Sequence, residues 1–150
     1  MNKEIENLLP HRKPFLYVDE VISADKEKIT GEHIFAEDEF FFAGHFPGYP
    51  VVPGVILIET MAQTGGAGLK KLAAAGEDTL PRGNSLFFLA SVDKVKFRRQ
   101  VRPGDKVRSE ITNLRVSPKM IKQAGKAYVG EELAAEAEWL CLVGSEGDLP

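Results

Sequence analysis

The length, composition and charge of the chain limit the kinds of protein it can be. Its 150 residues suffice for one compact domain, and 43% hydrophobic with 27% charged residues is ordinary for a folded soluble protein. A net charge of -3 argues against nucleic acid as the main partner, because neutralising phosphates requires a basic surface. The single cysteine, Cys141, excludes an intrachain disulfide and a metal site made of several thiolates.

The chain shows no targeting or membrane-spanning pattern. Its first residues, MNKEIENLLPHRKPF, mix charged and apolar side chains throughout, unlike a signal peptide. The longest apolar run, VVPGVILI, is far shorter than the roughly 20 residues of a spanning helix. No repeat or change of composition divides the sequence. We therefore expect a single domain over 1–150 in the cytoplasm.

The amino-terminal third predicts a short helix followed by two strands and a loop. Residues 2–9 form the helix, which a proline ends. Residues 15–25 and 28–38 are rich in β-forming side chains and are separated by polar ones, which predicts a hairpin. Residues 39–50 predict a turn or short helix and then an irregular loop.

The stretch 53–75 predicts the main helix. Proline suits its first turn, and Gly76 suits the position after its end. Apolar residues surround most of its circumference, which is typical of a buried helix. Gly65, Gly66 and Gly68 each cost about 1 kcal/mol of helix propensity relative to alanine. We expect another element to pack closely against them.

The rest of the chain predicts strands. They cover residues 85–91, 92–101, 106–117, 120–130 and 132–144, with a turn at 102–105. The last segment contains many alanines, glutamates and leucines, which favour a helix. Its apolar residues nevertheless alternate with Glu132, Glu136 and Glu138, and this period of two predicts a strand. Six or seven antiparallel strands curved around one helix, an α+β architecture, satisfy these patterns.

Two ionisable residues stand in one of the most apolar regions of the sequence, AGHFPGYPVVPGVILIET. His45 lies in the glycine- and proline-rich loop, where an imidazole can act as a base, although a structural or exposed histidine is the commoner case. Glu59 lies among apolar helix residues, so desolvation should raise its pKa unless it faces solvent. Gln63, one turn further on, is close enough to orient it. The histidine spacings match no common zinc pattern.

Gly54 supplies a third element at the start of the helix. Its N–H has no intrahelical partner there and can stabilise a developing oxyanion. Glu59 follows five residues later, a rise of roughly 7.5 Å. A base, an acid and an oxyanion donor in an apolar pocket suit elimination β to a thioester carbonyl. An unrelated proton-transfer reaction would use the same three groups.

Four segments resemble the FabZ-type 3-hydroxyacyl-[acyl carrier protein] dehydratases. They are LLPHRKPFLYVDEV (8–21), GHFPGYPVVPGVILIETMAQTGG (44–66), VDKVKFRRQVRPGD (92–105) and GKAYVGEELAAEAEW (125–139). The resemblance implies a hot-dog fold, a curved antiparallel sheet around a central helix. It implies that His45 and Glu59 are catalytic and that the amide of Gly54 meets the thioester carbonyl.

The resemblance also implies substrate and partners. The substrate is (3R)-3-hydroxyacyl-[acyl carrier protein], the product is the trans-2-enoyl form in fatty acid biosynthesis, and no cofactor or metal is needed. One site takes its histidine and glutamate from two subunits of a homodimer, and dimers often form hexamers as trimers of dimers. The residues implied to bind substrate are Phe46, Pro53, Val55, Gln63 and Phe88. Two residues depart from the family pattern: Tyr49 stands where the family usually has a basic residue, and Lys13 where an aromatic residue is common.

A basic stretch at 94–108 carries seven lysines and arginines in an otherwise acidic protein. Its alternating charges suit a solvated strand face. They also suit docking of an acidic partner, since opposite potentials speed encounter. Acyl carrier proteins are acidic, so the resemblance favours docking through Lys96, Arg98, Arg99 and Arg102.

Three alternatives to simple dehydration remain open at this point. A dehydratase that also isomerises the double bond requires only a reshaped tunnel. A hot-dog thioesterase would use a carboxylate to activate water, which the histidine in HFPG argues against. A non-catalytic subunit that binds the acyl carrier would have no use for an acid–base pair.

Overall fold

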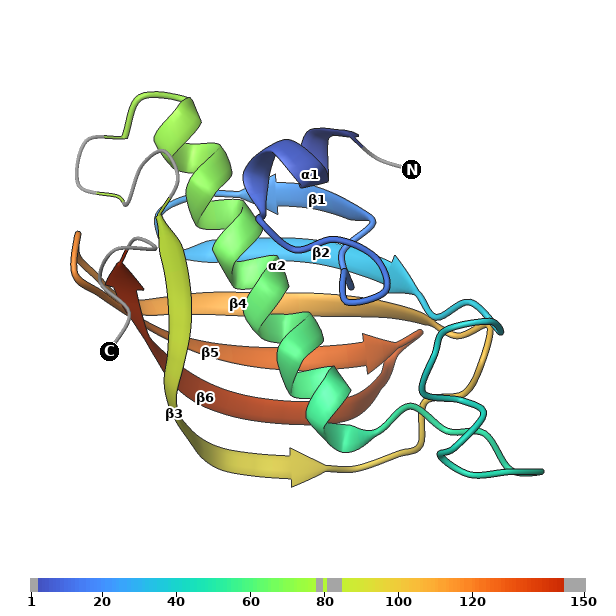
Figure 1. The fold of residues 1–150 in the computed structure, drawn as a ribbon. Helices are drawn as coiled ribbons and strands as arrows, with labels where there is room; N and C mark the ends of the chain where they lie inside the picture. Colours follow the sequence, from blue (N-terminus) through green and yellow to red (C-terminus); the bar gives the residue numbers. More distant parts are fainter. Residues whose placement is uncertain (1–2, 78–79, 81–84, 145–150) are drawn as a thin grey trace.

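The computed structural model describes residues 3–77, 80 and 85–144. Six strands form one antiparallel sheet in the order β1-β2-β4-β5-β6-β3, and this sheet curves around the long helix α2 (Figure 1). The elements are α1 (Lys3–Leu8), β1 (Glu20–Ala24), β2 (Lys28–Ile34), α2 (Gly54–Ala74), β3 (Leu86–Phe97), β4 (Lys106–Val116), β5 (Met120–Val129) and β6 (Glu132–Gly144). The predicted α+β architecture is confirmed.

The contested carboxy-terminal segment is a strand. β6 pairs with both β5 and β3, and its buried residues Ala135, Ala137, Trp139 and Cys141 alternate with more exposed ones. The indole Nε1–H of Trp139 donates to Oε1 of Gln123 at 3.1 Å, so its polar atom is paired inside the core. Pairing on both sides and burial of one face outweigh the helical propensity of alanine and glutamate.

Several strand predictions were wrong in their boundaries, and the strand predicted over 28–38 ends at Ile34. The predicted strands 85–91 and 92–101 are one continuous strand, β3, which ends at Phe97. Two register shifts against β6, at 89–91 and 93–96, bend it without ending its pairing. The first predicted strand begins at Glu20 rather than at residue 15. Tyr17 in that segment is buried, but its N–H donates to a helix side chain, Gln63, instead of a neighbouring strand.

The glycines of α2 allow the helix to approach the sheet closely. A Cβ at Gly68 would lie less than 3.0 Å from the side chain of Ile29 on β2, and one at Gly65 would collide with Gln123 on β5. The predicted close packing is confirmed. Within residues 3–77, 80 and 85–144, no helix is both long and apolar enough to cross a membrane.

Candidate active site

His45 lies in the loop before α2, and backbone contacts fix the orientation of its ring. Its N–H donates to the carbonyl of Phe41 at 3.0 Å, and its carbonyl accepts the N–H of Val51 at 2.9 Å. Its Nδ1 lies 3.0 Å from the carbonyl oxygen of Val51. A carbonyl can only accept, so Nδ1 carries the proton and Nε2 keeps its lone pair in the neutral ring. This is the tautomer that a general base requires.

Phe46 flanks the imidazole of His45. The two rings stack with centroids 4.1 Å apart and planes inclined by 27°. Phe46 is itself exposed, so the pair lies at the surface of one chain. An apolar wall beside the base suits a site that binds an acyl chain.

Glu59 lies in the second turn of α2, with its side chain 23% exposed. Burial raises the pKa of its carboxyl group, while a hydrogen bond from Gln63 opposes part of that effect. The Nε2 of Gln63 donates to Oε2 of Glu59 at 2.8 Å, which is the contact that the sequence predicted. A carboxylic acid whose proton is retained by burial can serve as a general acid.

Gln63 is buried and its amide is locked by two backbone groups. Its Oε1 accepts the N–H of Tyr17 at 2.8 Å, and its Nε2 also donates to the carbonyl of Phe15 at 3.2 Å. These contacts assign the amide orientation without ambiguity, because a flipped amide would face donor with donor and acceptor with acceptor. Gln63 therefore holds Glu59 in place, and its role in substrate binding stays a prediction.

Gly54 is the first residue of α2, and Pro53 precedes it as the capping residue. The N–H groups of Ile56 and Leu57 donate to the carbonyl of Pro53, at 2.9 and 3.3 Å. The N–H of Gly54 has no intrahelical acceptor, as expected at a first turn. A Cβ here would lie 2.7 Å from Cζ of Phe97, so only glycine leaves room between the helix start and that ring.

An apolar hollow of about 580 Å³ opens beside Gly54. Its lining comes from the loop before α2, the first turn of α2 and the end of β3: Val51, Val52, Gly54, Val55, Leu57, Phe97, Arg98, Arg99, Gln100 and Val101. Val55 within it is 70% exposed. The hollow adjoins the amide that was predicted to meet a carbonyl oxygen, and its walls suit an apolar chain.

Within one chain, the predicted base and acid have separate contacts. His45 contacts Phe46 and Val51, whereas the polar contacts of Glu59 are with Gln63 and His11. Across the described part of the chain, no hydrogen bond or ion pair joins His45 to Glu59. Within one chain, the two groups therefore contact different parts of the protein.

Phe88 lies on the face of β3 turned away from α2. The neighbouring Phe87 packs against the helix, where it would contact a Cβ placed at Gly66 at 3.0 Å. Side chains alternate along a strand, so Phe88 points to the opposite face. Its role in substrate binding stays a prediction.

The basic residues suggested for carrier docking are mostly engaged within the chain. Arg98 pairs with Glu136 at 2.7 Å, and Arg99 lies 3.5 Å from Glu132. The guanidinium of Arg102 lies over the ring of Tyr49, 4.4 Å from its centroid. Lys96 is exposed on β3.

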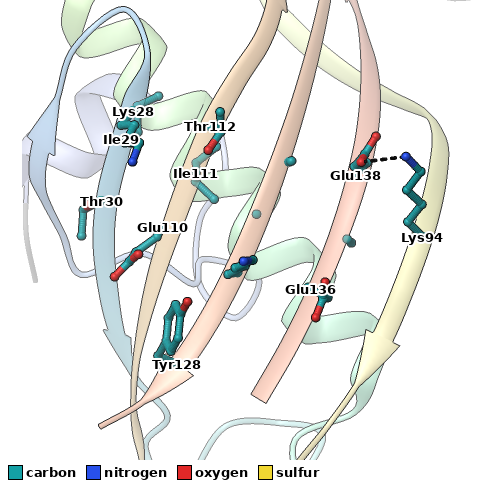
Figure 2. A pocket seen from close by; sticks show the side chains of 14 residues that line it. Lys28, Ile29, Thr30, Lys94, Glu110, Ile111, Thr112, Tyr128, Glu136 and Glu138 are labelled. Carbon is teal, nitrogen blue, oxygen red and sulfur yellow. Dashed lines mark ion pairs between the residues drawn. The ribbon is translucent and has the colours of Figure 1, made fainter. Parts of the chain in front are cut away.

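The outer face of the sheet carries a hollow of about 340 Å³ lined by charges of both signs. Figure 2 shows this face with α2 behind the strands, and Lys94 pointing to Glu138 across β3 and β6. These two form an ion pair of 3.3 Å. Lysines and glutamates alternate here without a histidine or cysteine. Such a mixture of paired charges is typical of a solvated sheet face.

Sequence reasoning missed one residue of the site. His11, in the turn after α1, places Nε2 3.5 Å from Oε2 of Glu59. Burial lowers the pKa of the His11 ring, and the charges of Lys70 and Arg12 lower it further. The sequence offered no spacing signal for this contact, because the two residues are far apart in the chain.

Comparisons with known proteins place the chain in a family. Residues 9–138 match the family described as a FabA-like domain. The 3-hydroxyacyl-[acyl-carrier-protein] dehydratase FabZ of Desulforamulus reducens is 44% identical over 144 residues, 95% of this chain and 96% of the relative. The enzyme of the same name from Pelotomaculum thermopropionicum is also 44% identical, over 93% of this chain and 96% of the relative.

A solved structure supports the fold. The dehydratase heterocomplex ApeI:P from Xenorhabdus doucetiae superposes with a TM-score of 0.76, covering 96% of this chain and 93% of that one, at 16% identity. At that identity the likeness speaks for the fold alone. The near-full-length identity to the curated dehydratases carries the assignment: this chain belongs to the FabZ-type 3-hydroxyacyl-[acyl-carrier-protein] dehydratases within the FabA-like family.

Proposed function

We propose that this chain dehydrates (3R)-3-hydroxyacyl-[acyl carrier protein] to the trans-2-enoyl form in fatty acid biosynthesis, in the cytoplasm. The 44% identity to curated FabZ enzymes supports the reaction. The observation that carries the mechanism is the hydrogen bond from Nδ1 of His45 to Val51, which leaves Nε2 as a base. Glu59 is the acid, and the Gly54 amide holds the thioester oxygen.

The three groups divide the elimination between them. Nε2 of His45 removes the α-proton, and the electrons of that C–H bond form the new double bond. The Gly54 N–H stabilises the negative charge that develops on the thioester oxygen. Glu59 gives its proton to the β-hydroxyl, which leaves as water, because hydroxide alone is a poor leaving group. The step yields the enoyl thioester, one water, a protonated His45 and an ionised Glu59, and transfer of the proton from His45 back to Glu59 through solvent restores the enzyme.

A second copy of the chain completes the site. Among the described strands, β3 pairs with β6 alone, so its other edge is free. Leu89 and Phe97 on β3, together with Phe46 and Val55 nearby, are large apolar side chains exposed in one chain. Such an edge invites pairing with another chain. We propose a homodimer that covers this surface and joins His45 of one copy to Glu59 of the other; assembly into hexamers stays a prediction.

The hollow beside Gly54 has both apolar and basic residues in its lining, which suits an acyl chain and its acidic carrier. The hollow beside Gly54, which Val55 lines, supports an acyl tunnel. Phe46, Pro53 and Phe88 stay predicted contacts of the acyl chain. Lys96, Arg98, Arg99 and Arg102 remain the proposed contacts for the acidic carrier, since basic residues at the mouth steer an acidic partner. Three of these four already have intramolecular partners, so their contribution should be to encounter rate.

A turnover assay tests this function directly. Purified protein is given 3-hydroxyacyl carrier substrates of several chain lengths while enoyl absorbance and free thiol are followed together. Enoyl formation without thiol release supports dehydration. Thiol release without enoyl would show a thioesterase, and neither product would show a binding subunit. Analysis for cis-3-enoyl chains detects isomerisation in the same samples.

A further inference from the structure

His11 is held next to the carboxyl group of Glu59 by a rigid turn. The guanidinium of Arg12 donates to the carbonyls of Leu9 at 2.8 Å, His11 at 2.6 Å and Glu6 at 3.0 Å, which fixes the backbone around the imidazole. Nε2 of His11 then lies 3.5 Å from Oε2 of Glu59. This exceeds a good hydrogen-bond length, but catalytic hydrogen bonds are often long in a free enzyme and shorten when substrate binds.

Gln63 and His11 approach the same carboxyl oxygen. The amide nitrogen of Gln63 donates one N–H to the carbonyl of Phe15 and the other to Oε2 of Glu59. Oε2 is therefore an acceptor whether Glu59 is ionised or protonated. When Glu59 is an acid, its proton is favoured on Oε1, because a carbonyl oxygen accepts hydrogen bonds better than a hydroxyl oxygen does.

We propose that His11 is a positioning residue that donates from Nε2 to Oε2 of Glu59. Together with Gln63 it keeps Oε2 as the accepting oxygen and leaves Oε1 to carry the proton that is transferred. The inference rests on the proposed role of Glu59 as the acid. It assigns the acid proton to one oxygen of Glu59 and gives the turn at residues 10–12 a function in the reaction.

The tautomer of His11 follows from its surroundings. Its Nδ1 is buried and has no hydrogen-bond partner within the described residues. A proton on Nδ1 would leave a buried donor unpaired, which proteins almost always avoid, and would turn the lone pair of Nε2 toward that of Oε2. A proton on Nε2 removes both conflicts. Burial lowers the pKa of the ring, so it is neutral and holds one proton.

The other charged or titratable groups near this pair do not take over its role. The Tyr17 phenol has a pKa of about 12 and the Cys141 thiol one of about 11, raised first by burial and then by nearby carboxylates, Glu59 among them. Both side chains therefore stay neutral at neutral pH. Lys70 and Arg12 are cations that act on His11 from α2 and from its own turn.

The tautomer can be measured in the unmodified enzyme. Long-range ¹H–¹⁵N correlation spectra of protein labelled at its histidines distinguish a protonated Nε2 from a protonated Nδ1, and His11→Gln identifies the signal. The proposal expects His11 protonated on Nε2 at neutral pH. A proton on Nδ1 would overturn it, and this result does not depend on any variant retaining activity.

A matched pair of variants tests the effect on turnover. In His11→Gln the side-chain amide reaches the former position of Nε2, whereas in His11→Asn it stops near that of Nδ1. We expect His11→Gln to keep most of kcat and His11→Asn to lose up to about 100-fold, with little change in KM, since a misplaced acid costs transition-state stabilisation. The alkaline limb of the pH–rate profile should move upward in His11→Asn, because a donor that favours the carboxylate is lost.

The outcomes separate this inference from the proposed function. Equal turnover in the two variants, whether normal or impaired, would overturn the donor role. If Glu59→Gln is inactive while both His11 variants match the unmodified enzyme, the inference fails and the function stands. If Glu59→Gln remains active, both the proposed role of Glu59 and the inference about His11 fail. Thermal unfolding of each variant shows whether lost turnover reflects lost structure.

Discussion

Nδ1 of His33 lies 2.8 Å from Oδ1 of Asp19, inside a cluster that anchors the loop leading to the active site. On the other side of the ring, Nε2 lies 3.1 Å from Oε2 of Glu39. Each carboxylate also accepts a backbone N–H, Asp19 from Ile34 at 2.7 Å and Glu39 from Ala36 at 2.9 Å. The imidazole donates to both carboxylates only when it is protonated. This cluster joins the segment before β1 to the end of β2 and the following loop.

The His33 cluster predicts a fall in stability at alkaline pH. Burial by itself would lower the pKa of the His33 ring, but the two carboxylates raise it to about 9, above the unfolded value of 6.5. The stabilisation is therefore complete below pH 6.5 and is lost as pH rises through about 9, to an extent of about 3 kcal/mol. Urea unfolding across this range measures it. His33→Gln should remove most of the slope; an unchanged slope would contradict the assignment.

Replacing His45 by asparagine separates the base from the loop structure. The side-chain amide of His45→Asn can still donate to the carbonyl of Val51, but no basic nitrogen remains at the Nε2 position. We expect kcat to fall by about 10²- to 10⁴-fold, the usual contribution of a general base. The unfolding temperature should change little. A variant with near-normal turnover would show that another group removes the α-proton.

Replacing Glu59 by glutamine removes the acid and should not cost stability. Burial raises the pKa of the Glu59 carboxyl in the folded state, so ionisation is disfavoured there and stability falls as pH rises above the unfolded value. Glu59→Gln removes that cost while Gln63 can still donate to the new side-chain oxygen. Turnover assays should show an inactive enzyme, and urea unfolding at neutral pH should show one at least as stable. A large loss of stability would indicate that Glu59 is structural.

Mixing two inactive variants tests whether each site is shared between copies. In a dimer of one His45→Asn chain and one Glu59→Gln chain, one of the two sites has both groups intact. Random exchange in equal amounts should restore about a quarter of normal activity for a two-fold symmetric dimer. The variants are unfolded and refolded together, with each alone as the control. If mixing restores nothing although mixed dimers form, the base and acid act within one chain.

A methyl group at Gly54 fits only if the ring of Phe97 moves away. The Cβ of Gly54→Ala would lie 2.7 Å from the ring of Phe97, in the space beside the amide proposed to bind the thioester oxygen. Alanine keeps the backbone N–H, but the clash moves it away from the thioester oxygen, so we expect kcat to fall by about 10²-fold or more, as when one oxyanion donor is lost. Adding Phe97→Leu relieves the contact and should restore part of the rate. No recovery in the double variant would mean that the methyl group blocks the substrate itself.

Local periodicity was a reliable guide to most of the fold. The period of two in residues 132–144 predicted β6 against its helical composition, because burial of alternate residues outweighs propensity. The apolar helix was predicted at 53–75 and is found at Gly54–Ala74. β3 was divided in two because its register shifts interrupt the alternation, and they appear only when it is paired with β6. The segment around Tyr17 resembles a strand because Tyr17 and Val18 are in the core.

The sequence by itself determined the local arrangement of the proposed catalytic groups: a histidine in a kinked loop, a glutamate with Gln63 one helical turn away, and a glycine amide at the helix start. These relationships lie within a few residues of each other, so helix and loop geometry suffice to predict them. Only the tertiary structure decided that Tyr17 and Phe15 lock Gln63 and that His11 approaches Glu59. Contacts between groups that distant in the chain depend on how the segments pack, and sequence spacing does not encode that packing.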